Sequence, residues 1–262
     1  MHPLLRLLAC AALSMAVIGA ACGGGASEES TASKTAAPVT NPVDPNTASA
    51  ITGVVTLQGT PPPNPPINRG SDPYCMKLGA ATTPVFVVSD DSGLENVFVY
   101  VKDGLGSLKF PVPSSPVVLD QKGCSYSPRV FGIQVGQSLD IVNSDETLHN
   151  IHALPMANRE FNRGQALQGM KYTTTFTAPE VMLPFKCDVH KWMNAWVGVL
   201  EHPFYAVSGK AGAFALAGLP PGTYTIEAWH EAAGTQTQQV TVPADGAATA
   251  DFSFKPGAAP GA

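Results

Sequence analysis

Short apolar runs separated by turn-forming residues recur along most of the chain. Stretches rich in β-branched residues at 51–57, 97–101 and 139–142 are typical of β-strands, and Gly, Pro, Asn and Asp gather between them. Further strands are expected at 85–88, 117–119, 130–135, 172–176, 196–200, 223–229, 240–242 and 250–254. Only 158–170 admits a turn or two of helix. The pattern therefore predicts an all-β protein.

The composition agrees with this pattern. Of the 262 residues, 25 are Gly and 24 are Pro, and only 13% are charged. Short strands joined by many turns have this composition more often than helical domains do. The formal net charge is −5, and no run of Lys or Arg occurs. Nucleic acid is therefore excluded as an expected partner.

The N-terminal region has the features of a targeting segment. Residues 7–21 form an apolar run too short to span a bilayer, so 1–21 is predicted to be a signal peptide. The residues before Cys22 are similar to the lipid-attachment motif of bacterial lipoproteins, although Gly19 stands where Leu is usual. We expect lipidation at Cys22, with plain secretion as the alternative.

A polar segment follows this targeting signal. Residues 22–50 are rich in Gly, Ser, Thr, Ala and Pro, which predicts a flexible linker. The mature protein is therefore expected outside the cytoplasm, in a bacterial periplasm or at the cell surface. It would contact a membrane only through its lipid anchor.

Four side chains have the spacing of a metal site. Cys187, His190 and Met193 lie within seven residues, and His149 follows a predicted strand well upstream. One thiolate, two imidazoles and a thioether form a ligand set that suits copper. Zinc would be expected to use two to four Cys and His ligands without Met. A catalytic Cys–His pair lacks an acid partner or an oxyanion site in the sequence.

This order of residues resembles the cupredoxins over about 117–200, and the short loop is most similar to that of amicyanins. The resemblance implies a Greek-key β-sandwich with one type 1 copper ion held by His149, Cys187, His190 and Met193. It also implies that Asn150 braces the ligand loop. Lys191 departs from the amicyanin pattern, which has Pro at this position. Electrons are expected to pass through an exposed edge of His190, with Trp192 and Lys191 as candidates for docking a redox partner protein.

Three of the five cysteines have separate expected fates. Cys10 leaves with the signal peptide, Cys22 is the anchor, and Cys187 is a ligand. Cys75 and Cys124 then remain as a disulfide or as two free thiols, and we expect the disulfide because the compartment is oxidising.

A second β-domain is indicated around the copper segment. The sequence Gly-Leu-Pro-Pro-Gly-Thr-Tyr at 218–224 resembles the carboxypeptidase regulatory-like domain, a small transthyretin-like β-sandwich. We expect 51–113 and 203–256 to form the two halves of that sandwich, with a cupredoxin domain at 114–202 inserted between them and a short tail at 257–262. The alternative is a cupredoxin with an extra N-terminal hairpin, followed by a separate sandwich.

These features favour a one-electron carrier. The alternative is a module that stores or senses copper while the β-sandwich recognises a partner. An enzyme is disfavoured because the remaining histidines, His152, His202 and His230, form no cluster in the sequence that would hold further copper ions. Alternation along the strand is expected to point His152 away from the metal.

Overall fold

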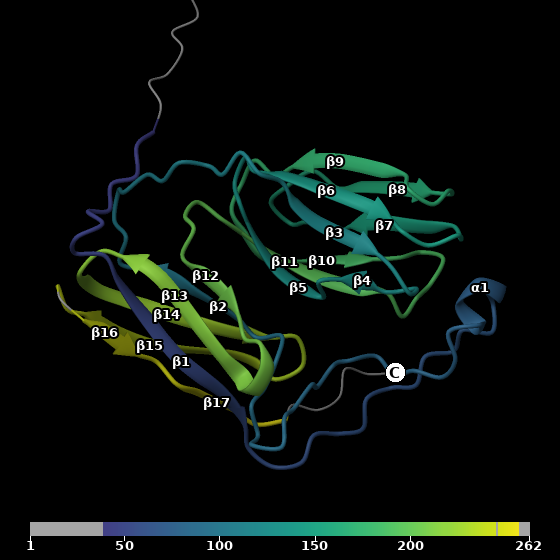
Figure 1. Cartoon of the computed structure of the whole chain (residues 1–262), viewed down its shortest axis with the longest axis horizontal. Coiled ribbons are helices and arrows are strands. Elements are labelled where there is room, and N and C mark those ends of the chain that lie inside the picture. The colour runs from purple at the N-terminus through teal and green to yellow at the C-terminus, as the bar shows by residue number, and fades with distance from the viewer. Residues whose placement is uncertain (1–38, 245, 257–262) are drawn as a thin grey trace, which may run out of the picture. The chain divides into compact units, whose positions relative to one another are not determined.

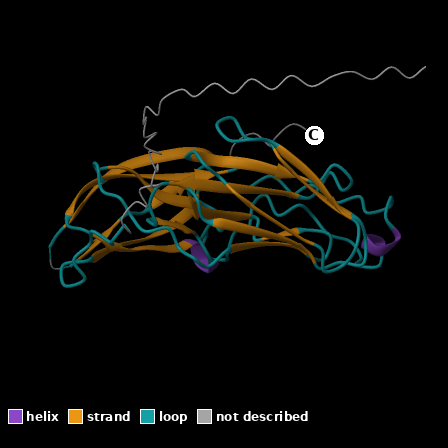
Figure 2. Cartoon of the chain, turned by 90° about the horizontal axis from the view of Figure 1, so that it is seen from above, coloured by secondary structure: helices purple, strands orange, loops and turns teal. Residues whose placement is uncertain are grey.

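The computed structural model describes residues 39–244 and 246–256, and strands dominate these ranges (Figure 2). The helices among the described residues are α1 (Pro73–Met76) and the 3-10 turn η1 (Lys210–Gly212). The predicted all-β fold class is confirmed. Within the described ranges, no helix has the length and apolar character needed to span a membrane.

Strands between residues 117 and 200 form two sheets, named here the central sandwich. They are β3 (Val117–Gln121), β4 (Tyr126–Ser127), β5 (Val130–Gln134), β6 (Ser138–Asn143), β7 (His149–Ala153), β8 (Phe161–Gln165), β9 (Lys171–Thr175), β10 (Glu180–Lys186) and β11 (Asn194–Leu200). The strand orders are β5-β11-β10-β7-β8 and β4-β3-β6-β9. Apolar side chains from both sheets meet in one buried core, including Leu119, Ile141, Ile151 and Phe185.

Strands on either side of that block form two other sheets, named here the flanking sandwich (Figure 1). They are β1 (Ser49–Leu57), β2 (Phe98–Asp103), β12 (Tyr205–Val207), β13 (Ala213–Leu219), β14 (Gly222–His230), β15 (Gly234–Val242), β16 (Ala247–Thr249) and β17 (Phe252–Phe254). β1 pairs with β13, β16 and β17, and β2 pairs with β12 and β14. Strands from before and after the central sandwich thus share sheets and one core.

The two sandwiches meet at a pair of glycines. Gly198 of β11 lies opposite Gly132 of β5 in the parallel register. A Cβ on Gly198 would lie 2.2 Å from the ring of Phe98, and one on Gly132 would lie 2.3 Å from the ring of Tyr205. The two rings stack with centroids 5.8 Å apart. Only glycine lets these rings approach the backbone so closely.

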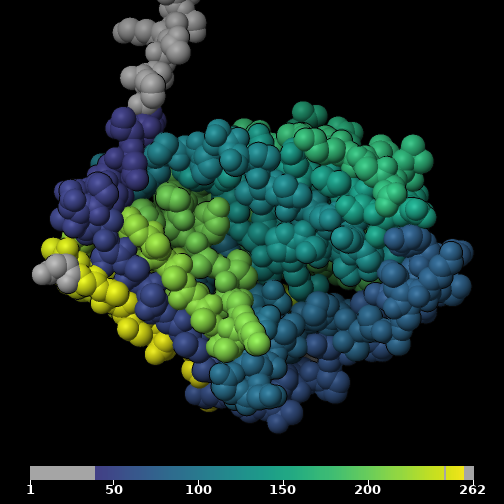
Figure 3. All heavy atoms as spheres, in the orientation of Figure 1, coloured from purple at the N-terminus to yellow at the C-terminus, as the bar shows by residue number. Residues whose placement is uncertain are grey.

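Between β1 and β2 the chain makes a long excursion toward the central sandwich. Its arms at 65–83, named here the covering loop, are joined by hydrogen bonds from Ile67 N–H to Ala81 O and from Thr83 N–H to Pro65 O. α1 stands at its far end (Figure 1). In the space-filling view the blue atoms of this part of the chain lie against the teal and green atoms of the central sandwich (Figure 3).

Four local expectations need correction. No strand forms at 85–88, where Val88 makes an isolated bridge with Leu94. The segment 158–170 holds β8 rather than helical turns, because residues 161–165 pair along the whole of β7. β1 begins at Ser49, inside the predicted linker. α1 was not predicted, although Asp72 and Pro73 are typical residues for the start of a helix. The predicted signal peptide, the lipidation at Cys22, the linker up to residue 38 and the tail at 257–262 lie outside the described residues.

Candidate metal centre

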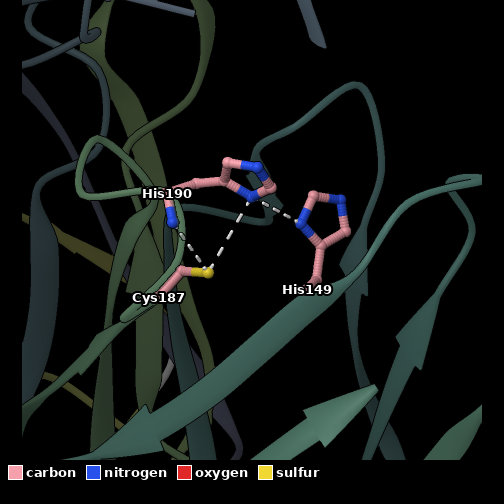
Figure 4. A group of neighbouring side chains, drawn as sticks. All are labelled: His149, Cys187 and His190. Carbon is pink, nitrogen blue, oxygen red and sulfur yellow. Dashed lines mark hydrogen bonds between the residues drawn. The ribbon is translucent and has the colours of Figure 1, made fainter. Parts of the chain in front are cut away.

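The side chains of His149, Cys187 and His190 converge where β7 begins and β10 ends (Figure 4). These strands are neighbours in one sheet, which brings the two distant parts of the sequence together. The two Nδ1 atoms lie 3.0 Å apart, and Cys187 Sγ lies 4.0 Å from His190 Nδ1. All three residues are fully buried. Three of the four predicted ligands therefore converge in one small, fully buried space.

Met193 lies at the end of the loop that carries Cys187 and His190. Its N–H donates to His190 O at 2.9 Å, and Cys187 N–H donates to Met193 O at 3.1 Å. These bonds close residues 187–193 into a compact turn before β11. Met193 is buried in the same apolar core as Cys187. The fourth predicted ligand is thus buried in the core that contains Cys187, at the end of the same loop.

The surroundings of Cys187 favour its thiolate. Burial by itself would raise the pKa of this thiol, but hydrogen bonds with His149 and His190 and from backbone N–H groups outweigh it. Together they lower the pKa from 9.0 to about 6. The N–H of His190 donates to Sγ at 3.3 Å. The thiolate is the form that binds metals, so the site presents a metal-ready sulfur at neutral pH.

Asn150 braces the ligand loop from the neighbouring strand. Its Oδ1 accepts a hydrogen bond from the N–H of Asp188 at 2.6 Å. Its carbonyl accepts the hydroxyl of Tyr126, and its amide nitrogen donates to Asn162. The residue after the thiolate is therefore tied to the strand that carries His149.

Asp145 orients His149 from behind. Its Oδ2 lies 2.8 Å from His149 Nε2 and also accepts the N–H of Cys124 at 2.7 Å. Its Oδ1 accepts the N–H of Gly123 and the hydroxyl of Tyr74. Burial raises the pKa of this carboxyl, but the hydrogen bonds outweigh it and the pKa is lowered. A carboxylate on Nε2 leaves Nδ1 directed at the centre, as metal-binding histidines require.

His190 is held in the same way, by Asp72 of the covering loop. Asp72 Oδ2 lies 3.0 Å from His190 Nε2 and accepts the hydroxyl of Thr147 at 2.7 Å. Its Oδ1 accepts the N–H groups of Tyr74 and Cys75, which caps α1. Burial raises the pKa of Asp72, but these hydrogen bonds lower it to about 2.

The expectation of an exposed His190 edge is wrong. The residue is fully buried, because Asp72 and Cys75 cover the Nε2 side of the ring. Cys75 Sγ lies 3.7 Å from Nε2. The physical reason is the covering loop, whose sequence gives no sign that it folds over the ligand.

A disulfide fixes this cover to the central sandwich. Cys75 of α1 is bonded to Cys124, which precedes β4. The carbonyl of Cys124 also accepts the indole N–H of Trp192 at 2.9 Å. The Trp192 ring lies 5.0 Å from the His190 ring, centroid to centroid, and is half-buried. Trp192 is therefore in contact with both the ligand and the surface, and Lys191 beside it is exposed.

Two further histidines, His152 and His230, lie away from the centre. His152 Nδ1 lies 2.9 Å from Asp188 Oδ2, and its Nε2 lies 2.7 Å from Glu160 Oε1 near the surface. His230 is buried in the flanking sandwich against Phe86.

The residues that the sequence did not point to are Asp72 and Asp145. The helix-start signal at Asp72 could have located the cap, but no signal connects either carboxylate with the histidines.

The donor set fits copper. One thiolate, two imidazole nitrogens and a thioether buried in the same core as the thiolate match the soft and borderline ligands that copper prefers. A structural zinc site would use more thiolates or histidines, and Cys187 is the free cysteine among the described residues. Each imidazole is braced by a carboxylate, so the ligands are set before any ion binds.

Comparison with known proteins gives partial matches. The model of the carboxypeptidase regulatory-like domain matches residues 194–255. No curated protein matches the sequence. A copper-containing nitrite reductase from Thermus scotoductus SA-01 is similar in structure at 24% identity and TM-score 0.32, covering 36% of this chain and 24% of that one.

Two smaller proteins are similar to the same extent. A variant of amicyanin in its Cu(I) form aligns at 21% identity and TM-score 0.29, covering 34% of this chain and 85% of that one. A purple cupredoxin from Nitrosopumilus maritimus aligns at 22% identity and TM-score 0.28, covering 32% and 98%. Because these TM-scores are low, the metal assignment rests on the site itself.

The fold and site define a double β-sandwich protein with a buried His–Cys–His centre. Its last part, 194–255, matches the carboxypeptidase regulatory-like domain.

Proposed function

We propose that this chain is an extracytoplasmic protein that binds one copper ion in a type 1 site and carries one electron at a time. The convergence of His149, Cys187 and His190 in one buried space carries the proposal. When bound, copper supplies a one-electron couple in a ligand set that suits both of its oxidation states. Met193 would supply a weakly bound thioether as the fourth ligand.

The chain's own residues would keep the ligands in place through each cycle. Asp145 holds His149, Asp72 holds His190, and Asn150 holds the turn after Cys187. Ligands fixed by hydrogen bonds and close packing rearrange little when the charge at the centre changes. With copper bound, these residues would keep the cost of rearranging the ligands during electron exchange low.

We place the exchange surface at Trp192 rather than at His190. The Nε2 edge of His190 is covered, whereas Trp192 contacts the His190 ring and is half-exposed. A redox partner protein would dock against Trp192 and Lys191. The proposal assigns no catalytic step to the chain. It also includes a lipid anchor at Cys22 and a location at a bacterial membrane surface or in a periplasm.

We also propose that the chain is one interrupted sandwich, 51–113 and 203–256, with the copper-binding domain at 114–202 inserted between its halves. The pairing of β1 and β2 with strands that follow residue 203 supports this division.

Copper titration of the purified apoprotein tests the function. One equivalent of Cu(II) is expected to give an intense visible thiolate-to-copper charge-transfer band and a reversible one-electron wave in voltammetry. Cys187→Ser should abolish the band, and His149→Gln should weaken it. His152→Gln is the matched control and should keep the band, because His152 lies outside the centre. A colourless wild-type protein loaded with copper would contradict the proposal.

A copper-storage module is the second candidate, favoured by the complete cover over His190. Storage predicts that a copper chelator removes the metal at mild concentrations and that no reversible electron exchange occurs. Electron transfer predicts the reverse, so chelator competition followed by voltammetry on one sample separates the two functions.

A further inference from the structure

A cavity of about 620 Å³ lies where the covering loop meets the ends of β5, β11 and β14. Phe86, Trp192 and Trp196 line it together with the prolines of 62–65. This volume is in the usual range for sites that bind small molecules, which are largely apolar with a few polar groups. A wall of aromatic and proline rings suits a flat, apolar body.

The charged side chains that line the cavity leave one positive charge unpaired. Arg129 and Glu231 line it but neutralise one another, with Nε–Oε1 at 2.7 Å and Nη2–Oε2 at 2.8 Å, and both are largely buried. Arg129 also lies over the Trp196 ring, 4.8 Å from its centroid. Lys191 is exposed at the rim and forms no ion pair with any described residue. The cavity therefore keeps one uncompensated positive charge at its rim.

Trp192 joins this cavity to the metal centre. Its ring lies 5.0 Å from that of His190. A second cavity of about 40 Å³, too small for more than water, is lined by Trp192 and Met193 and shares Arg129 and Asn194 with the larger one. A molecule in the large cavity would thus lie one indole ring away from a ligand residue.

We propose that this cavity binds a small aromatic carboxylate of one or two rings. The ring would pack against Trp192, Trp196 and Phe86, and the carboxylate would pair with Lys191 at the rim. The aromatic wall and the single free cation, rather than the copper site, select this class. The proposal concerns the apoprotein and needs no copper. The cavity shares Trp192 and Lys191 with the surface proposed above for a redox partner, so a bound carboxylate would occupy part of that surface.

Calorimetric titration of the full-length apoprotein with 2-naphthoate tests it. We expect saturable binding with a dissociation constant below about 1 mM. In nitrogen-15 spectra, the Trp192 and Trp196 indole signals should shift while the Trp229 signal moves less, because Trp229 does not line the cavity. Cyclohexanecarboxylate, which lacks an aromatic ring, and 2-naphthylmethylammonium, whose charge is reversed, should each bind at least fivefold more weakly.

Two variants separate the ring from the charge. Lys191→Gln should weaken naphthoate binding about three- to fivefold, the effect of a partly exposed ion pair, whereas the exposed control Lys210→Gln should not change it. Trp192→Leu should weaken binding more, and Trp192→Phe should restore part of the loss. No saturable heat at millimolar naphthoate, or equal binding by wild type, Lys191→Gln and Trp192→Leu, would overturn the proposal. Copper loading is not needed for any of these measurements.

Discussion

Asp72 Oδ2 lies 3.0 Å from His190 Nε2, although the two residues stand in different parts of the fold and far apart in the sequence. The other oxygen of the same carboxylate caps α1. One side chain therefore organises the covering loop and orients a predicted metal ligand. Asp72 couples the covering loop to the candidate metal centre, so changes in the loop should alter the position of His190.

Replacing Asp72 should loosen α1. Asp72→Ala removes the cap on the N–H groups of Tyr74 and Cys75 and should destabilise this turn by about 1 kcal/mol. The amides of both residues should then exchange about fivefold faster. Asp72→Asn keeps a capping oxygen and should show a smaller effect. Hydrogen exchange of the apoprotein, followed by NMR, measures both variants. Equal protection of Tyr74 and Cys75 in wild type and Asp72→Ala would show that the carboxylate does not hold the helix.

Removing the disulfide should destabilise the protein and uncover His190. The bond joins positions 49 apart, and losing such a link typically costs about 2–4 kcal/mol. Urea unfolding of Cys75→Ala/Cys124→Ala apoprotein measures the loss, and diethylpyrocarbonate labelling measures access to His190. A reductant should shift the unfolding midpoint of the wild type but not of the double variant. Unchanged labelling of His190 would mean that the loop covers the ring without the disulfide.

The free energy of unfolding should fall between pH 6.5 and 4 because of His230. Burial lowers the pKa of His230 from 6.5 to about 4, and its Nδ1 accepts the N–H groups of Ala232 and Ala233. In this window the unfolded chain binds a proton that the folded protein does not, so stability is complete above pH 6.5 and declines as the pH falls. The contribution is about 3 kcal/mol.

The variant His230→Asn isolates this effect, since its amide oxygen can accept the same N–H groups without titrating. The test compares how the free energy of unfolding changes with pH, and not its value at pH 7. The slope of unfolding free energy against pH, from chemical denaturation at several pH values, should be shallower than in the wild type. Parallel slopes would assign the acid sensitivity to other groups.

Gly198→Ala should destabilise the protein by disturbing the packing between the two sandwiches. The new methyl group would lie 2.2 Å from the Phe98 ring, which is fully buried. Overpacking of this kind costs about 1–3 kcal/mol. Gly164→Ala in β8 is the matched control, because its Cβ would meet nothing nearer than Leu148 at 4.0 Å. Thermal unfolding compares them, and Phe98→Leu should recover part of the Gly198→Ala loss. Equal melting temperatures for the two alanine variants would contradict the packing interpretation.

Strand patterns gave a dependable prediction of the all-β class because alternation and β-branching act locally. The errors arose where pairing overrides local pattern. Residues 161–165, Phe-Asn-Arg-Gly-Gln, show no alternation, yet they form β8 because β7 offers an unpaired edge. Likewise α1 is a single turn held by one cap and one disulfide, too short to leave a periodic signal.

The proposed metal ligands could be predicted from the sequence because Cys187, His190 and Met193 occupy one short loop, which any fold must keep together. Their chemistry alone points to copper. What the sequence could not decide is what lies around them. Asp72 and Cys75 contact His190, and Asp145 contacts His149, because the sheets and the covering loop bring distant parts of the chain together. Local spacing determines which atoms can bind the ion, whereas long-range packing determines which of them solvent or a partner can reach.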